Sequence, residues 1–302
     1  MKLPSRVKLV DVGPRDGLQN EKEPVPAEVK IGLVHRLQDA GLKEIEVTSF
    51  VSPRWVPQMA DAAEVMAKIE RKPGVRYSVL TPNMKGFEAA LDSRPDEIVV
   101  FGAASEAFSQ RNINCSIAES IERFAPVVAA ARAHGIHVRG VVSCVVGCPY
   151  EGDIAPERVG MVARLMKEIG VQHAGVADTI GVGTPLKVQR AMEAVLGHFA
   201  VDDVSGHFHD TYGMALANTL AAMEMGVWQY DTSSAGLGGC PYAKGATGNV
   251  ATEDVVFMLH GMGIDTGIDF DKLVDAGEYI SGFLGRKPNS RAATATLNKR
   301  AA

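Results

Sequence analysis

The stretch VSGHFHDTYGMALANTLAAMEMGVWQYDTSSA, residues 204–235, contains one complete unit of the expected fold. Its β-branched and apolar start predicts a strand over Val204–His209, and the residues that follow have helical periodicity over Met214–Met225. A second strand is expected over Tyr230–Ala235. A strand, a helix and a strand in this order are typical of a parallel sheet.

The same alternation continues toward the N-terminus and gives eight strand–helix units in all. No Pro/Gly/Ser-rich linker divides them, which favours closure into an α/β fold, the (β/α)8 TIM barrel, over an open doubly wound sheet. We expect a single catalytic domain over 1–302, with its barrel at about 7–265. The other expected strands are Val7–Gly13, Glu44–Phe50, Arg76–Leu80, Glu97–Gly102, Val138–Cys144 and Ala174–Asp178, and the other expected helices are Ala27–Ala40, Ala62–Ile69, Met84–Ala90, Ile117–Ala133, Pro156–Ile169, Pro185–Phe199 and Glu253–Gly261.

The C-terminal region, 266–302, lies beyond the eighth unit. The amphipathic pattern of Phe270–Leu284 predicts one extra helix. The last residues, Arg286–Ala302, are polar with little to anchor them, so we expect a mobile tail.

The composition is that of an ordinary soluble globular protein, with 46% hydrophobic and 22% charged residues. The formal net charge is −5 and the sequence has no basic stripe, which argues against a nucleic-acid partner. No apolar run is long enough for a membrane span, and the N-terminus does not resemble a targeting peptide. A cytoplasmic protein with no membrane association is therefore expected.

The four cysteines are too few and too scattered for a disulfide framework in a chain of 302 residues. Cys144 and Cys148 have a spacing that a metal pair could use. No second cysteine pair completes a closed zinc site, so we interpret them as two small buried residues.

Unusual residues gather in the segments that directly follow the expected strands, whereas the turns from helices into strands are plainer. Because the C-terminal rim of a TIM barrel carries the active site, these segments mark the active face. They are GPRDGLQNEKEP, SFVSPRWVPQM, VVGCPYEG, ADTIGVGTP, HFHDTYG and SAGLGGCPYAKGATGN.

Two histidines at the end of the seventh strand are candidate metal ligands. Residues two apart on a strand share a face, so His207 and His209 would offer two nitrogen atoms to one cation in the lumen. The alternative is a pair of histidines buried for packing. Asp16 follows the first strand. In a closed barrel the first and seventh strands both neighbour the eighth, so the carboxylate of Asp16 can reach the same ion.

Arg15 and the loop after the eighth strand supply further candidates. Arg15 offers a planar cation suited to an enolate oxygen, although a surface Arg–Asp pair would explain an isolated RDG tripeptide equally well. The glycine-rich loop, residues 236–249, can approach a ligand closely and contains a thiol, Cys240, and an amide, Asn249. Its spacing matches neither a P-loop nor a dinucleotide fingerprint, and a flexible surface loop is the alternative.

Two carboxylates, Glu46 and Asp178, stand at or near the ends of the second and sixth strands, where a barrel places catalytic acids. Either could instead hold an arginine or cap the next helix. For Asp178 the capping interpretation is an equal rival.

One carboxylate, two imidazoles and an amide would make a mixed oxygen and nitrogen shell with positions left open for substrate. Such a shell suits Mg²⁺ or Mn²⁺ better than structural zinc, and Co²⁺ could substitute.

From about Val7 to about Arg286, the chain resembles the 3-hydroxy-3-methylglutaryl-CoA lyase family of TIM-barrel metallolyases. The resemblance rests on VGPRDGLQNE, TSFVSP, WVPQM, LTPN, GFEAA, FGAASE, NINCSI, GCPYEG, DTIGVGTP, HDTYG, ALANT, AGLGGCPYA and GNVATED. It implies a divalent cation held by Asp16, His207, His209 and Asn249.

The resemblance also implies roles for the other candidates. Arg15 would bind substrate and stabilise the enolate, and Cys240 would be the acid/base thiol of a mobile loop. Glu46 and Asp178 fall on active-site carboxylates of the family. Phe208 stands where relatives have a smaller residue, and it is expected to face away from the metal.

The implied reaction is a retro-Claisen cleavage of 3-hydroxy-3-methylglutaryl-CoA into acetyl-CoA and acetoacetate, as in leucine degradation and ketone-body formation. Asp178, or a group working through it, would remove the hydroxyl proton, and Cys240 would protonate the enolate. The implied partner is a small-molecule acyl-CoA, and a homo-oligomer is expected.

Three alternatives stay open from the sequence. The nearest is the same chemistry on a related 3-hydroxyacyl-CoA, such as a longer-branched glutaryl-CoA or a citramalyl-CoA. A Claisen synthase would share the RDG and H-x-H elements, but Cys240 is typical of the lyases. A catalytically inactive barrel is disfavoured because every metal and acid/base position has a competent residue.

Overall fold

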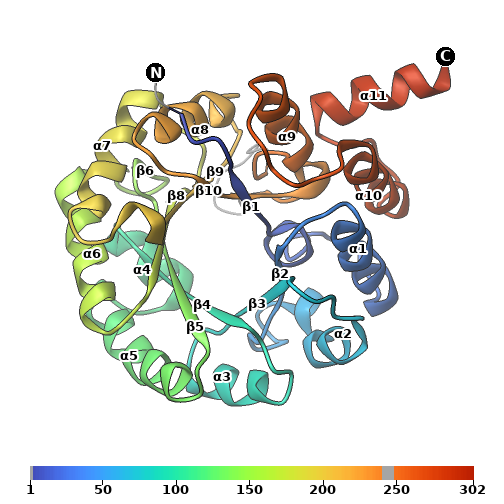
Figure 1. Ribbon diagram of the computed structural model, residues 1–302. Coiled ribbons are helices and arrows are strands. Elements are labelled where there is room, and N and C mark those ends of the chain that lie inside the picture. The colour runs from blue at the N-terminus through green and yellow to red at the C-terminus, as the bar shows by residue number, and fades with distance from the viewer. Residues whose placement is uncertain (1–2, 240–247) are drawn as a thin grey trace.

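A closed barrel of eight parallel strands forms the centre of the molecule (Figure 1). The computed structural model describes residues 3–239 and 248–302. Every strand of the barrel overlaps a predicted one, so the predicted TIM barrel is confirmed. Around the ring, the strands are β1 (Lys8–Asp11), β10 (Gln229–Thr232), β9 (Val204–Phe208), β8 (His173–Asp178), β5 (His137–Ser143), β4 (Glu97–Ala103), β3 (Arg76–Leu80) and β2 (Glu44–Ser49).

Helices surround the barrel, and each of the eight predicted for the strand–helix units has a counterpart. They are α1 (Ala27–Asp39), α2 (Ala62–Lys68), α3 (Met84–Leu91), α5 (Ile117–Ala133), α6 (Pro156–Glu168), α7 (Pro185–Leu196), α8 (Ala215–Glu224) and α9 (Thr252–Gly261).

Two short elements on the active face were not predicted. Helix α4 (Glu106–Ile113) begins at Ser105, whose hydroxyl accepts a hydrogen bond from Phe108 N at 3.0 Å. The hairpin of β6 (Gly147–Cys148) and β7 (Gly152–Asp153) follows β5. Helix α4 buries only Phe108 and Ser109, so its sequence carries little apolar periodicity, and β6 and β7 have only two residues each.

The two faces of the barrel strands bury different chemistry. Ile45 and Val47 of β2 belong to the apolar layer between strands and helices. Glu46, between them, instead contacts Arg139 of β5, which also pairs with Asp231 of β10. Because β2, β5 and β10 are not neighbours, these contacts cross the barrel, and the lumen contains buried ion pairs.

The prediction of a mobile C-terminal tail was wrong. After the expected helix α10 (Phe270–Phe283) comes α11 (Arg291–Ala301), which extends away from the barrel in Figure 1. Ser290 caps α11, and Asp254 of α9 accepts hydrogen bonds at 2.7 Å from both Ser290 Oγ and Ala292 N. These contacts, the burial of Ala293 and the pairing of Arg300 with Asp271 and Asp275 of α10 anchor the segment.

Cys144 and Cys148 are buried, as predicted, and Cys148 Sγ lies 2.9 Å from Ser105 Oγ. Across residues 3–239 and 248–302, none of the helices combines the length and the apolar character that crossing a bilayer requires.

Candidate active site

A cavity of about 700 Å³ opens at the C-terminal ends of the barrel strands. The first turn after β1 and the end of β9 supply its polar wall, with Arg15, Asp16, His207 and His209. Strands β3, β4 and β5 supply an apolar wall opposite, formed by Leu80, Val99, Phe101 and Val141.

Asp16, His207 and His209 form a cluster that could hold a metal ion. Each offers one ligand atom, and these atoms all lie within 4.8 Å of one another. His207 Nε2 is 4.0 Å from Asp16 Oδ2, and the two imidazole centroids are 5.4 Å apart. Both histidines are buried, as a pair facing the lumen requires.

Asn249 completes the cluster from the far end of the loop after β10. Its Nδ2 donates to Asp16 Oδ2 at 2.8 Å, and an isolated bridge pairs its backbone with that of His209. Among the described residues, Asn249 Oδ1 and His209 Nδ1 are buried and have no hydrogen-bond partner. Leaving such atoms unpartnered is costly, and a cation would satisfy them, so the residues present fit a divalent metal.

His207 has its orientation fixed from behind. Its Nδ1 lies 3.1 Å from Asp231 Oδ2, which leaves Nε2 to face Asp16. Burial alone would lower the pKa of His207, but the hydrogen bond to Asp231 and the charges of both carboxylates raise it. A carboxylate behind a metal-binding histidine is the usual means of fixing its tautomer.

His209 has no such partner, and its pKa falls to about 4, chiefly through burial and then through the charge of His207. Burial opposes ionisation of Asp16, but the charges of Arg15 and His207 hold the pKa of that carboxyl well below its usual range. Near neutral pH, the cluster therefore offers a carboxylate and at least one neutral imidazole.

Arg15 lies in a turn of π-helix, Gly13–Gly17, directly after β1. Its Nε donates to Glu46 Oε1 at 2.5 Å, and its Nη1 donates to Asp16 Oδ1 at 2.6 Å. Gly17 is needed for close packing, because a Cβ there would lie 2.7 Å from Leu237 Cβ. The RDG motif thus places a buried guanidinium beside the candidate metal site.

Glu46 is fully buried and contacts two arginines, Arg15 and Arg139. It does not line the cavity. Of the three interpretations given for it, its contacts favour the one in which it holds an arginine.

Asp178 faces away from the cavity. Its carboxylate accepts hydrogen bonds from Val182 N at 3.1 Å and Gly183 N at 2.7 Å, so it stabilises the loop before α7. Its neighbours Ala177 and Thr179 line the cavity and Asp178 does not. This is the pattern expected when successive side chains of a strand point to opposite faces. Burial raises the pKa of Asp178 to about 6. Asp178 therefore holds the loop that leads to α7 and does not cap the helix, since the N-cap residue of α7 is Thr184.

Cys240 lies outside the described residues. The described ends of its loop meet closely, because a Cβ on Gly248 would lie 2.5 Å from the backbone of Gly238. One end of the loop reaches the candidate metal ligands through Asn249, which donates to Asp16, and Gly239 at the other end lines the cavity.

Sequence reasoning missed Asp231 and Arg139. Asp231 is the one charged residue of the expected eighth strand, Tyr230–Ala235, and a charge inside a strand was a signal for it. Arg139 is a lone charge inside an apolar strand, which is a recognisable anomaly. Phe208, by contrast, packs against Tyr230 with ring centroids 6.3 Å apart and faces away from the cluster, as predicted.

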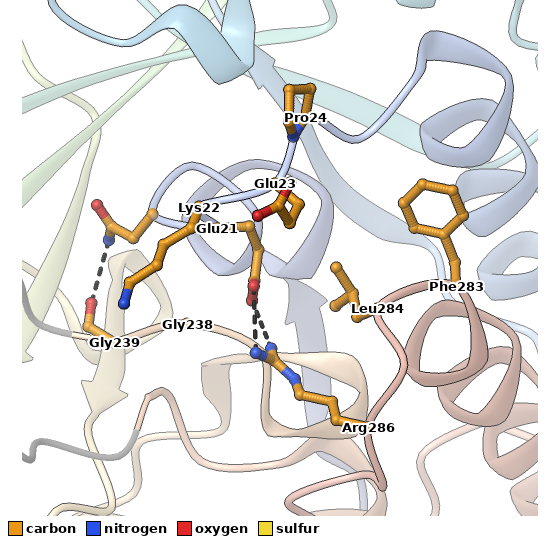
Figure 2. A pocket seen from close by; sticks show the side chains of 10 residues that line it. Glu21, Lys22, Glu23, Pro24, Gly238, Gly239, Phe283, Leu284 and Arg286 are labelled. Carbon is orange, nitrogen blue, oxygen red and sulfur yellow. Dashed lines mark hydrogen bonds and ion pairs between the residues drawn. The ribbon is translucent and has the colours of Figure 1, made fainter.

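A second cavity of about 470 Å³ lies beside the first (Figure 2). Asn20 and Gly239 line both cavities, and Asn20 Nδ2 donates to Gly239 O at 3.1 Å. On the other side, Arg286 pairs with Glu21, with Nη1 3.1 Å from Oε2. Figure 2 shows this pair beneath Leu284, at the junction of the β1–α1 loop and the C-terminal segment.

Known proteins match the chain over nearly its whole length. The HMGL-like family model matches residues 6–280. A Pseudomonas aeruginosa protein named 3-hydroxy-3-isohexenylglutaryl-CoA/hydroxy-methylglutaryl-CoA lyase is 58% identical over 299 residues, covering 99% of this chain and 100% of that protein. The human mitochondrial hydroxymethylglutaryl-CoA lyase is 55% identical over 294 residues, covering 97% of this chain and 90% of that protein. The crystal structure of hydroxymethylglutaryl-CoA lyase from Pseudomonas aeruginosa matches with a TM-score of 0.97 and 58% identity over 99% of this chain and 100% of that chain.

Proposed function

The chain belongs to the HMGL-like family, and from that premise we propose that it is a lyase that cleaves 3-hydroxy-3-methylglutaryl-CoA into acetyl-CoA and acetoacetate. The observation that carries the proposal is the convergence of Asp16, His207 and His209 beside Arg15, on the polar wall of one cavity. Such a site can bind an oxygen-rich substrate and stabilise the negative charge that develops when a carbon–carbon bond breaks.

The proposed cofactor is Mg²⁺ or Mn²⁺, with Co²⁺ as a substitute, held by Asp16, His207, His209 and Asn249. When bound, the cation supplies Lewis-acid chemistry that lowers the pKa of a coordinated substrate hydroxyl. The residues' own contribution is a preformed set of donors: Asp231 already orients His207, and Arg15 already orients Asp16.

Arg15 is the proposed stabiliser of the enolate. Its guanidinium is buried and held by Glu46 and Asp16, so its charge is in place before substrate binds. Donors fixed in advance cost no reorganisation when charge develops on the thioester oxygen. Glu46 serves in this scheme to position Arg15.

Cys240 is the proposed acid that protonates the enolate carbon. An unperturbed thiol has a pKa of about 8.5, close to the working pH. We expect Cys240→Ala to leave Mn²⁺ affinity unchanged while turnover falls by orders of magnitude, and unchanged turnover would refute the role. For removal of the hydroxyl proton we propose a group that works through Asp178, since the oxygens of Asp178 accept from backbone N–H groups of the loop before α7.

The proposal is tested by a coupled assay of acetyl-CoA release from a panel of 3-hydroxyacyl-CoA thioesters, with and without Mg²⁺. Cleavage of 3-hydroxy-3-methylglutaryl-CoA that depends on the cation is the expected result. No cleavage of any thioester in the presence of Mg²⁺, Mn²⁺ or Co²⁺ would overturn it.

A second candidate substrate class is a glutaryl-CoA with a longer 3-substituent. The Pseudomonas aeruginosa relative carries an isohexenyl substrate in its name. The apolar wall of Leu80, Val99, Phe101 and Val141 offers a surface that a hydrocarbon branch could contact. The ratio of kcat/KM for the methyl and isohexenyl thioesters separates the two candidates. The cytoplasmic location and the homo-oligomer stay predictions.

A further inference from the structure

One buried guanidinium, that of Arg139, contacts three carboxylates in the barrel lumen. Its Nη1 donates to both oxygens of Asp231 at 2.7 Å, its Nη2 donates to Glu46 Oε2 at 2.9 Å, and its Nε donates to Glu97 Oε1 at 3.1 Å. Arg139 is only 2% exposed, and it does not line the cavity. It therefore lies behind the cavity wall, to which its partner Asp231 belongs.

Two of those carboxylates have a second contact in the active site. The other oxygen of Glu46 accepts from Arg15, and Asp231 Oδ2 faces His207 Nδ1. A continuous chain of contacts thus runs from the proposed enolate-stabilising group, through Arg139, to a proposed metal ligand. The three strands involved, β2, β5 and β10, are not neighbours in the barrel, so no backbone ladder links them directly.

We propose that Arg139 is a positioning residue that fixes Arg15 and His207 relative to each other, through Glu46 and Asp231. The proposal rests on the proposed function, since it deepens the roles given to Arg15 and His207. An error in their separation would misplace the cation relative to the enolate-stabilising charge, and small misplacements of catalytic groups are costly.

The geometry requires arginine. Three separate N–H groups of a rigid plane reach three carboxylates, whereas a lysine offers one compact charge that cannot hold all three directions at once. The third partner, Glu97, provides an internal comparison. In the described part of the chain it pairs with Arg139, with His137 at 2.8 Å and with Arg76 at 3.7 Å, and none of these three residues lines the cavity.

The test compares Arg139→Lys with the matched control Glu97→Gln. For Arg139→Lys we expect kcat to fall by about 10- to 100-fold, the KM for the acyl-CoA to stay within about threefold, and the Kd for Mn²⁺ to weaken about tenfold. Glu97→Gln removes a partner of the same guanidinium and should leave all three within about threefold. The Mn²⁺ titration does not need turnover, so it stays informative even if the proposed lyase activity is absent.

Loss of thermal stability in Arg139→Lys with kcat and Mn²⁺ affinity both within threefold would overturn the proposal, because it would show a purely structural role. An equal loss of kcat in Glu97→Gln would overturn it as well. If Arg139→Lys does not fold, the double variant Arg139→Gln/Glu97→Gln removes one cation and one anion together. The same fall in kcat is then expected, and kcat within threefold of wild type contradicts the positioning role.

Discussion

At the scale of single residues, the site depends on arginines held by carboxylates. Arg15 is fixed by Glu46 and Asp16, and Arg139 is fixed by Glu46, Glu97 and Asp231. Buried charges need such partners, because an unpaired ion in the interior is strongly destabilising. Here the carboxylates of Glu46 and Asp16 also hold the guanidinium of Arg15 at the wall of the cavity.

Arg15→Gln removes the charge that is proposed to meet the enolate. By analogy with a lost oxyanion-hole donor, we expect kcat to fall about 10²- to 10³-fold with a small change in KM. Steady-state kinetics measure both. Arg164→Gln, at an exposed ion pair with Glu168 on α6, is the control and should behave as wild type. If kcat falls by less than tenfold, Arg15 does not have the assigned role.

Glu253 makes folding stability depend on pH. Burial raises its pKa to about 8, while its carboxylate accepts from Ala235 N at 2.8 Å. Because the folded pKa exceeds the unfolded one, the folded state keeps a proton that the unfolded state releases, and stability falls as pH rises from about 5 to 8. Glu253→Gln keeps an acceptor and does not titrate. The free energy of unfolding of the variant, minus that of wild type, should therefore increase from pH 5.5 to pH 8.5, by on the order of a few kcal/mol.

Urea unfolding at the two pH values measures that difference. Asp11, whose pKa burial raises to about 6, titrates in both proteins, and its charge is one of the causes that raise the pKa of Glu253. A difference between variant and wild type that is equal at both pH values contradicts the assignment.

At the scale of elements, the parts with a strong period were predictable and the short or contact-dependent parts were not. The H-x-H spacing on β9 needs only strand alternation to bring His207 and His209 to one face. Helix α11 has no such pattern, because its anchor is the carboxylate of Asp254 on another helix. Asp231 and Glu46 acquire their roles only when distant strands meet across the lumen, which local sequence does not encode.

Helix α11 should be released by Asp254→Ala. The carboxylate accepts from Ala292 N and the Ser290 hydroxyl, so its loss removes two of the bonds that hold the first turn, at a cost of about 1 kcal/mol, while Ser290 still accepts from Ala293 N. We expect limited trypsin digestion to cleave after Arg286 faster than in wild type, with lyase activity within twofold. The control is Asp275→Ala on α10. It breaks an exposed pair with Arg300 of α11 and should change the digestion little. Equal protection of both variants would contradict the anchor.

At the scale of the whole molecule, the fold separates two interiors. Apolar residues fill the layer between strands and helices, while the lumen holds a charged network that ends at the C-terminal rim. The apolar layer stabilises the barrel by burial, which leaves the lumen free to hold charges in fixed positions. The local sequence pattern predicts the apolar layer, whereas the charged lumen exists only once the ring of strands has closed.

Metal removal links the site to the stability of the whole barrel. A cation that binds only the folded state adds RT ln(1 + [M]/Kd), or about 2.7 kcal/mol at a concentration of 100 Kd. Removal with EDTA should therefore lower the Tm by several degrees, and excess Mn²⁺ should restore it. His209→Ala removes one proposed ligand, so its Tm should respond much less to either treatment, whereas His198→Ala, at an exposed position after α7, should respond as wild type. A wild-type Tm that is the same in EDTA and in Mn²⁺ would mean that Asp16, His207 and His209 hold no cation, and the charged lumen would then have to be explained by structure alone.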